Sequence, residues 1–330
     1  MNLESELIIL GNGTEWCSCS LNKLTSREKV RFFNERLPLK NRYILQIARL
    51  HYSYKLEKYI EIPGKTIWYK KFCKDLGLDA NKHQILMIYD RNILGGEKSF
   101  IHYLRKHFPT IKLVYVFTNI VKYTGAKERD YVEKLNGWYD VVFAFDQLDA
   151  KKYGFNYSPL IYDSFEGSSD AENKQDLVFY VGQAKDRLKD LIKSFERLNE
   201  INIKTDFNIV KVTEPEMKYS DIIKYNKTMS YKDVIKKIKS SSCLIDIIQG
   251  ESTGLTIKNC EAIVYQKKLI TTNKSIKEYP FYDSRFIKVI ESPDDITLDF
   301  FENNRNVVYK NSDYFSSDKF IERLVKALNE

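Results

Sequence analysis

Histidine, glycine and proline are scarce in this chain of 330 residues, and each scarcity excludes a class of protein. The 13 Gly and 7 Pro exclude collagen-like and low-complexity chains. The four histidines end at His107, so the second half offers no histidine as a base or metal ligand. No apolar run approaches the roughly 18 residues that a membrane-spanning helix needs, so we expect no transmembrane segment.

Cysteine is also sparse, with five residues in the whole chain. Glu4 and Glu6 stand where a secretory signal would need a basic start and an apolar core. We therefore expect no signal peptide, reduced thiols and a cytoplasmic location. Cys17 and Cys19 form a C-x-C pair, but no histidine or second cysteine pair is near them in sequence, which disfavours a zinc site.

Three motifs that carry well-known chemistry are missing. The chain has no G-x-G-x-x-G and no G-x-x-x-x-G-K-[ST], which argues against a dinucleotide oxidoreductase and a P-loop nucleotidase. No D-x-D follows a predicted strand, which disfavours a metal-dependent, single-domain sugar transferase.

The net charge of +8 is concentrated in one stretch of the chain. Residues 20–74 contain 14 Lys and Arg against 4 Asp and Glu, a balance of +10, so the remainder sums to −2. Several tyrosines and a tryptophan are interspersed among these cations. Such a mixture fits contact with an anionic membrane face, or less well with a nucleic acid. The alternative is a solvated helical surface whose aromatic residues lie in the core.

Apolar residues make up 43% of the chain, enough for packed cores, and its length favours two domains. Strand, loop and helix alternate in both halves. This alternation predicts an α/β fold of two Rossmann-like, doubly wound domains facing across a cleft. We place the domains at residues 1–165 and 166–330, joined by a polar linker at 164–176. The predicted strands lie at 7–10, 85–89, 113–117, 141–145, 177–181, 207–212, 243–248 and 268–272.

The predicted helices include one that a Thr25-x-x-Glu28 capping box would open and Pro38 would stop. The others lie at 41–60, 97–107, 128–136, 187–199, 231–240, 255–265 and 316–328. In doubly wound folds, ligands bind at the carboxyl ends of the strands, so polar residues after strands are the candidates.

The stretch 244–273, LIDIIQGESTGLTIKNCEAIVYQKKLITTN, is the most informative. A buried strand leads into a polar loop, and a helix begins between Thr253 and Thr256, just after Gly254. Free N–H groups at a helix start can bind a pyrophosphate. Lys258 could approach the phosphate. Glu251 would reach over the sugar, and Glu261 could accept hydrogen bonds from ribose hydroxyls. An ordinary strand–helix turn with surface charges is the alternative.

A second stretch, FYVGQAKDRLKDLIKSFERL at 179–198, places cations after a strand. Gly182 ends the predicted strand, and Lys185 and Arg187 follow it. Two cations beside a helix start can neutralise a leaving nucleoside diphosphate. On its own, a basic residue after a strand is common.

Together these stretches resemble a known family. The order VGQAKDRLKDLIKSF, MSYKDVIKKIKSSSCLIDI and GESTGLTIKNCEAIVYQKKLITTN resembles the donor half of bacterial GT-B-fold glycosyltransferases of lipopolysaccharide and capsular polysaccharide biosynthesis. ILMIYDRN, LRKHFPTIKLVYVFTN and FAFDQLDAKKYG in the first half are similar to the same group. The resemblance covers about residues 40–290 and is diffuse.

The resemblance implies roles for individual residues. It places Gly182, Lys185 and Arg187 near the diphosphate, and Glu261 on the ribose. It also places Thr253, Gly254 and Thr256 at the phosphate-binding helix start. Glu251 and Glu261 are ten positions apart, unlike the paired glutamates of many retaining relatives, so inverting and retaining mechanisms both stay open.

An inverting transferase needs a base that removes the proton of the acceptor hydroxyl, worth roughly 10²–10⁴ in rate. Glu15, Asp90 and Asp146 each follow a predicted strand in the first half. We favour Asp90, because the loop DRNILGGEKS is long and contains glycine. A loop or capping aspartate without chemistry is the alternative.

The resemblance therefore implies transfer of a sugar from a nucleotide-sugar donor to a lipid-linked or growing surface glycan, such as a polyprenol-linked acceptor. We expect no metal cofactor, no nucleic-acid partner, and a cytoplasmic protein peripheral to the inner face of the cell membrane. Two alternatives remain: a nucleotide-sugar epimerase of the same double fold, and a non-enzymatic protein that binds nucleic acid or anionic lipid.

Overall fold

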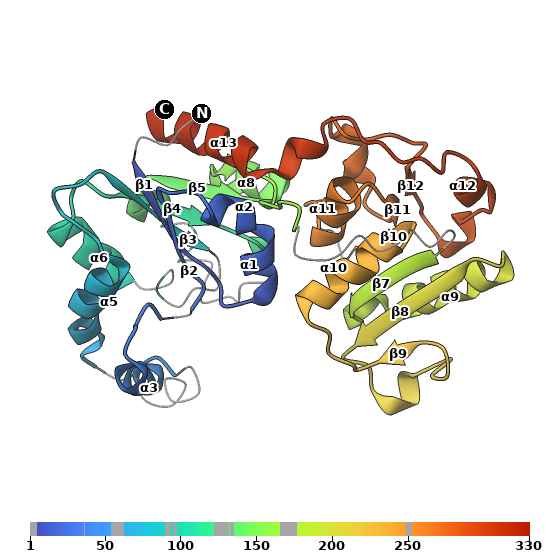
Figure 1. Cartoon of the computed structure of the whole chain (residues 1–330), viewed down its shortest axis with the longest axis horizontal. Coiled ribbons are helices and arrows are strands. Elements are labelled where there is room, and N and C mark those ends of the chain that lie inside the picture. The colour runs from blue at the N-terminus through green and yellow to red at the C-terminus, as the bar shows by residue number, and fades with distance from the viewer. Residues whose placement is uncertain are drawn as a thin grey trace. The chain divides into compact units, whose positions relative to one another are not determined.

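The computed structural model describes residues 5–35, 37–53, 63–89, 94, 98–121, 132, 135–165, 177–248 and 253–330. Contacts divide the chain into two units, 1–158 with 320–330, and 159–319. Each unit contains a six-stranded, wholly parallel sheet (Figure 1). The prediction of two doubly wound α/β sheets is therefore confirmed.

The first sheet has the order β2-β1-β3-β4-β5-β6. Its strands are β1 Glu6–Leu10, β2 Val30–Phe33, β3 Gln84–Tyr89, β4 Lys112–Val116, β5 Val141–Ala144 and β6 Asn156–Tyr157. The helices and 3₁₀ turn of this unit are α1 Glu15–Ser20, α2 Asn22–Thr25, α3 Arg42–His51, η1 Lys65–Trp68, α5 Tyr69–Leu76, α6 Lys98–His107, α8 Gln147–Tyr153 and the end of α13 Ser317–Asn329.

Alternation along the central strands explains how both faces of this sheet are covered. Ile8 and Leu10 of β1 belong to a core cluster with Phe72 of α5 and Phe100 of α6. The side chains between them point to the opposite face, because strand side chains alternate. In Figure 1, α5 and α6 lie on one side of this sheet, and α1 and α2 lie on the other.

The second sheet has the order β12-β11-β10-β7-β8-β9. Its strands are β7 Leu177–Gln183, β8 Lys204–Val210, β9 Lys224–Tyr225, β10 Cys243–Asp246, β11 Lys268–Thr271 and β12 Ile287–Val289. The helices and 3₁₀ turns are η4 Lys185–Arg187, α9 Leu188–Glu200, η5 Glu214–Glu216, α10 Tyr231–Ser240, α11 Ile257–Val264, η6 Lys274–Glu278, η7 Pro293–Asp295, α12 Asp299–Glu302 and η8 Ser312–Phe315.

One predicted helix is wrong. The chain turns at Ser26 after the short helix α2, and residues 30–33 form β2 where the Thr25 capping box predicted a helix. Val30 and the two phenylalanines pair in parallel with β1, with Leu7 opposite Val30. Pairing with a buried neighbour strand outweighs a local capping signal, and β-branched and aromatic residues suit a strand.

Three other predictions fall outside the described residues. These are most of the linker, most of the 128–136 helix, and the second half of the 41–60 helix, of which α3 is the described part. The predicted domain boundary at 165/166 assigns donor and acceptor halves, and it stays a prediction. The division by contacts falls at Pro159 instead and assigns the end of α13 to the first unit. There Phe320 packs against Phe143 of β5, with 5.5 Å between ring centroids.

None of the helices in the described ranges is long and apolar enough to cross a bilayer. All five cysteines are buried thiols outside any disulfide. Burial raises the pKa of Cys17 to about 12, which disfavours the thiolate that a metal would need.

Candidate nucleotide site of the second unit

The candidate site lies where the order of the second sheet reverses. The chain runs outward from β7 to β8 and β9, then returns to place β10 on the other side of β7. Loops leave these two neighbouring strands in opposite directions, which opens a crevice at their carboxyl ends. The segments after β7 and β10 are those that the sequence singled out.

Arg187 ties the ends of the two strands together. One guanidinium nitrogen donates to the carbonyl of Gln183 at the end of β7, and another donates to the carbonyl of Ile247 just after β10, each at 2.7 Å. Its Nε is buried without a hydrogen-bond partner among the described residues. The guanidinium thus brings positive charge to the reversal point while it holds the two loops in register.

Lys258, in the first turn of α11, reaches back over β7. Its Nζ donates to the carbonyl of Val181 at 2.6 Å and lies 5.0 Å from the centre of the Tyr180 ring. Burial lowers the pKa of the Lys258 ammonium, against the opposing attraction of Glu261 and Asp246. A partly desolvated ammonium interacts more strongly with an arriving anion than one in bulk water does.

Gly182 makes this approach possible. A Cβ at that position would lie 2.9 Å from the Tyr180 hydroxyl oxygen and 3.6 Å from Nζ of Lys258. A side chain there would have to displace the tyrosine hydroxyl. The glycine that the sequence singled out is therefore a point of close approach.

Lys185 occupies the turn directly after β7, with a φ of 48°. A left-handed backbone at a non-glycine residue is uncommon and carries a small cost in energy. The side chain is exposed. The turn thus presents Lys185 at the carboxyl edge of the sheet.

The start of α11 is fixed by Thr256, which the sequence singled out, together with Asp246 and Asn259, which it did not. Asp246, at the end of β10, is buried and accepts hydrogen bonds from the Thr256 hydroxyl and the Asn259 amide, each at 3.0 Å. The Asn259 carbonyl oxygen in turn accepts from the backbone N–H of Thr256 at 2.9 Å. Thr256 is therefore a structural cap whose hydroxyl points to Asp246.

The loop before α11 is held from the segment after β11. The Asn273 amide donates to the carbonyl of Gly254 at 3.2 Å, and the Ser275 hydroxyl donates to the carbonyl of Thr253 at 2.7 Å. Both donors follow a strand, which is the signal that could have identified them. The N-terminal N–H groups of α11 are thus pre-positioned at the sheet edge, where an anion would find them.

Glu261 lies one turn further along α11 and is 3% exposed. Its Oε1 accepts a hydrogen bond from the Tyr231 hydroxyl at 2.6 Å, and that hydroxyl lies 2.9 Å from the hydroxyl of Tyr162. Burial raises the pKa of the Glu261 carboxyl to about 7, although Lys258 and the Tyr231 hydrogen bond oppose the shift. Glu261 therefore changes its charge near neutral pH.

The sequence candidates in the first unit are only partly described. Asp90 follows β3, and Glu251 follows β10 in the second unit; both lie outside the described residues. Glu15 is exposed in the first turn of α1. Asp146 accepts from the N–H groups of Leu148 and Asp149, so it caps α8.

In the described ranges, no three His, Cys, Asp or Glu side chains gather as metal ligands would. The positive charge that the structure places at the carboxyl edge of the second sheet comes from Lys185, Arg187, Lys258 and the start of α11.

Comparison with known proteins gives the class of fold. No protein-family model and no curated protein matches this sequence. An α-glucosyltransferase solved with UDP and a 13-mer DNA is 12% identical with a TM-score of 0.58, covering 99% of this chain and 100% of its own. A UDP-forming α,α-trehalose-phosphate synthase from Burkholderia xenovorans is 11% identical with a TM-score of 0.55, covering 99% of each chain.

A third similar structure is of another kind. The Glycosylation Associate Protein (Gap123) complex from Streptococcus agalactiae contains a chain that is 13% identical with a TM-score of 0.51. The match covers 83% of the present chain but only 61% of that longer one. The present chain thus has the GT-B glycosyltransferase fold over nearly its whole length.

Proposed function

We propose that this chain is a glycosyltransferase that binds a nucleotide-sugar donor, UDP-linked, in its second unit. The observation that supports this most is the cluster at the reversal point between β7 and β10. There Arg187, Lys258 and the start of α11 offer positive charge to a diphosphate. The similar α-glucosyltransferase was solved with UDP, and the similar trehalose-phosphate synthase is UDP-forming, which favours uridine as the nucleoside.

The individual contacts follow from this geometry. The diphosphate would lie between Lys185, Arg187 and Lys258, over Gly182 and the turn Thr253–Thr256. Glu261 would accept hydrogen bonds from the ribose hydroxyls after the Tyr231 hydroxyl stops donating to its carboxylate. Positive side chains and a helix start stabilise a leaving diphosphate without a metal ion, so the proposed reaction is metal-independent.

The acceptor is proposed to be a lipid-linked or growing surface glycan, as in lipopolysaccharide or capsule synthesis. The first unit would bind this acceptor, and Asp90 or Glu15 would remove its hydroxyl proton. The basic stretch 20–74 would face an anionic membrane surface on the cytoplasmic side, with the protein peripheral to it.

Thermal unfolding in the presence of UDP-, GDP-, dTDP- and CMP-sugars tests the donor. A tight ligand stabilises by RT ln(1 + [L]/Kd), about 2.7 kcal/mol at a hundredfold excess over Kd. We expect UDP-sugars to raise the melting temperature most. Lys185→Ala and Glu261→Ala should each weaken UDP binding, whereas Lys193→Ala, an exposed lysine of α9, should not.

Product analysis with a polyprenol-linked acceptor then tests the reaction. A glycan product supports the transferase, and a free epimerised sugar nucleotide would support the epimerase. No melting shift with any nucleotide sugar, together with salt-dependent binding of nucleic acid, would overturn the proposed function.

A further inference from the structure

Helix α3 of the first unit exposes a stripe of large apolar side chains. Tyr43, Ile47 and Leu50 are 83%, 59% and 63% exposed. Their spacing of i, i+4 and i+7 places them on one face of the helix. We call these three residues the outer stripe of α3.

The opposite face of α3 already packs on the protein. Ala48 is fully buried in the core cluster of the first unit, and Ile44 and Leu45 pack against that cluster. An ordinary amphipathic surface helix has one apolar face and turns a polar face to water. Helix α3 has an apolar face on each side, so burial in this unit does not account for its outer stripe.

Basic residues flank the outer stripe. Arg42 and Arg49 lie on the helix itself, Lys40 precedes it, and all three are exposed. Among the described residues 37–53 and 63–75 there are seven Lys and Arg and one acidic residue, Asp75, which is buried and pairs with Lys71.

The 3₁₀ turn η1 adds to this surface beside the end of the helix. The Trp68 indole N–H donates to Nδ1 of His51 at 2.9 Å, which joins η1 to the last residue of α3. The neighbouring Ile67 is 65% exposed. Two elements that are joined by a side-chain hydrogen bond therefore each present an exposed apolar residue.

We propose that the outer stripe of α3 and Ile67 lie in the interface of an anionic membrane. An apolar helix face flanked by cations is the pattern of helices that lie along a bilayer surface. A tyrosine suits the depth of the lipid headgroups. The cations with no exposed Asp or Glu beside them in residues 37–53 and 63–75 complement the negative charge of an anionic surface.

A second copy of this chain fits the surface less well. Pairing of two outer stripes would bring the flanking arginines of both copies together without an exposed carboxylate in residues 37–53 or 63–75 to offset them. Like charges in one interface oppose association. The membrane is therefore the occupant that the charges favour.

This inference rests on the proposed function, because membrane binding would serve to bring the enzyme to a lipid-linked acceptor. The test measures binding to vesicles and does not depend on sugar transfer. Failure to bind vesicles leaves the donor site untouched, and failure to bind UDP leaves the vesicle result untouched.

Co-sedimentation of the whole chain with vesicles tests the inference. We expect binding to phosphatidylcholine vesicles that contain phosphatidylglycerol, little binding to pure phosphatidylcholine, and weakening as salt rises. Ile47→Ser should weaken binding roughly fivefold to tenfold, because one large apolar side chain no longer enters the interface. Leu148→Ser is the matched control, since Leu148 of α8 is also 59% exposed and should not matter.

Charge variants complete the test. Arg42→Gln and Arg49→Gln should each weaken binding roughly fivefold at low salt. Lys151→Gln and Lys152→Gln, exposed on α8, should have little effect. Ile47→Leu should bind like the parent because its side chain stays large and apolar, and a parent-like melting temperature of Ile47→Ser would exclude a folding defect.

Three outcomes would overturn the inference. One is equal binding to neutral and anionic vesicles. Another is equal loss of binding in Ile47→Ser and Leu148→Ser. The last is a dimer, seen by sedimentation velocity, that Ile47→Ser dissociates while vesicle binding stays unchanged, which would assign the outer stripe to a second copy.

Discussion

Both sheets are six-stranded and parallel, but they differ in strand order and in the groups around the loop after their first strand, β1 or β7. In the second unit, Arg187 and Lys258 bring positive charge to the ends of β7 and β10. In the first unit, the loop after β1 is held by uncharged groups. Asn34 accepts from the Gly13 N–H at 3.0 Å and donates to the Thr14 carbonyl at 2.7 Å.

This difference fits the division of labour between the units that we propose. Cations suit a diphosphate, whereas amides and hydroxyls suit a neutral sugar or alcohol. Changes at the first reversal point should therefore alter turnover, and changes at the second should alter UDP binding. The variants below test that separation, from the largest expected effect to the smallest.

Asp90→Asn should lower turnover by roughly 10²–10⁴-fold, because the amide cannot accept the acceptor proton. The UDP dissociation constant should stay near the parent value, since Asp90 follows β3 of the other sheet. Initial rates of sugar transfer and calorimetric UDP titrations would measure both.

Glu15→Gln and Glu251→Gln test the other two candidate carboxylates in the same transfer assay as Asp90→Asn. Parent-like transfer by Asp90→Asn with loss in Glu15→Gln would move the base to the loop after β1. Full activity in all three would mean that none of these carboxylates is the base, and the donor site would still stand.

Glu261→Gln should change how stability depends on pH. The Glu261 pKa of about 7 in the folded chain is above its ordinary value of 4.5. The carboxyl thus favours the fold fully below about pH 4.5, and this contribution is lost as pH rises through 7. The loss amounts to about 3 kcal/mol, and the glutamine variant should lack it.

Urea unfolding at pH 5 and pH 8 would measure this difference. Glu302→Gln, on the exposed surface of α12, is the control and should keep the parent's pH dependence. The same pH dependence in Glu261→Gln and the parent would show that the Glu261 carboxyl titrates at its ordinary pKa.

Lys258→Met should weaken UDP binding by roughly 10- to 100-fold, the effect of losing about 1.5–3 kcal/mol from one charged hydrogen bond. Lys193→Met keeps the change in charge but lies elsewhere on the second unit, so it should bind UDP normally. Equal affinities in both variants would remove Lys258 from the donor site.

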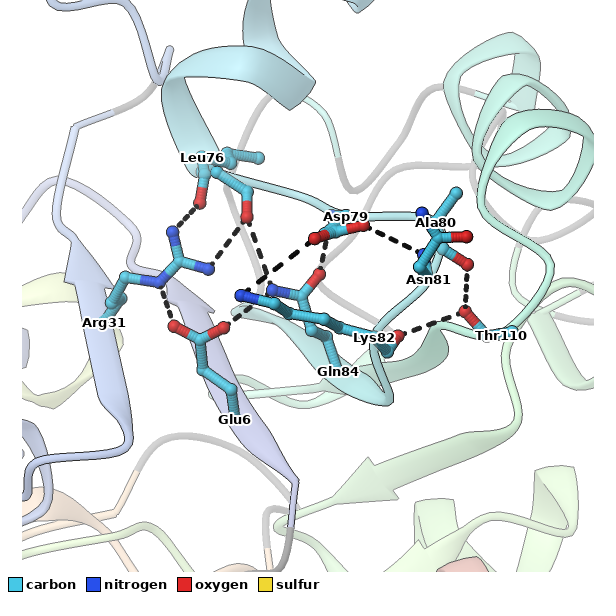
Figure 2. Close-up of polar contacts among 10 residues, drawn as sticks. Glu6, Arg31, Leu76, Asp79, Ala80, Asn81, Lys82, Gln84 and Thr110 are labelled. Carbon is cyan, nitrogen blue, oxygen red and sulfur yellow. Dashed lines mark hydrogen bonds and ion pairs between the residues drawn. The ribbon is translucent and has the colours of Figure 1, made fainter.

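The smallest expected effect comes from a substitution at the amino ends of the strands of the first sheet. Arg31 of β2 pairs with Glu6 of β1 at 2.5 Å and donates to the carbonyls of Leu76 and Gly77 at 2.6 and 3.0 Å (Figure 2). These groups satisfy one another far from the carboxyl ends of the strands. Arg31→Ala should cost about 1–2 kcal/mol of stability with no change in UDP affinity.

Chemical denaturation and UDP titration of Arg31→Ala would measure the two quantities. A loss of UDP affinity would show that the amino edge is coupled to the ligand site. It would also argue against the idea that the amino edge serves stability alone and the carboxyl edge serves ligand binding.

Much of the fold could be predicted from the sequence, because continuous apolar runs such as residues 85–89 form buried parallel strands. β2 could not, since its pairing with β1 depends on residues distant in sequence, whereas the Thr25 capping box acts locally. Helix α5 could not be predicted either, because its few apolar and aromatic residues alternate with lysines of the basic stretch and give no clear helical period.

For the candidate site, the sequence indicated which loops to consider but not which side chains contact one another there. Glycine and cations after strands singled out Gly182, Arg187 and Lys258, whose role in binding a ligand stays a prediction. The hydrogen bond of Tyr231 to Glu261 spans 30 positions, and that of Asn273 to Gly254 spans 19. Such pairings are set by how elements pack, which no local pattern contains.

The division of helix α13 between the two units has a consequence for synthesis on the ribosome. Ser317 at its start is bound by the carboxylate of Asp163, whereas Phe320 covers Phe143 of the first sheet. The first sheet is made early, yet its covering side chain emerges after the whole second unit. Domains usually fold in the order of their synthesis, but here Phe143 lacks the cover of Phe320 until residues 320–330 have been translated.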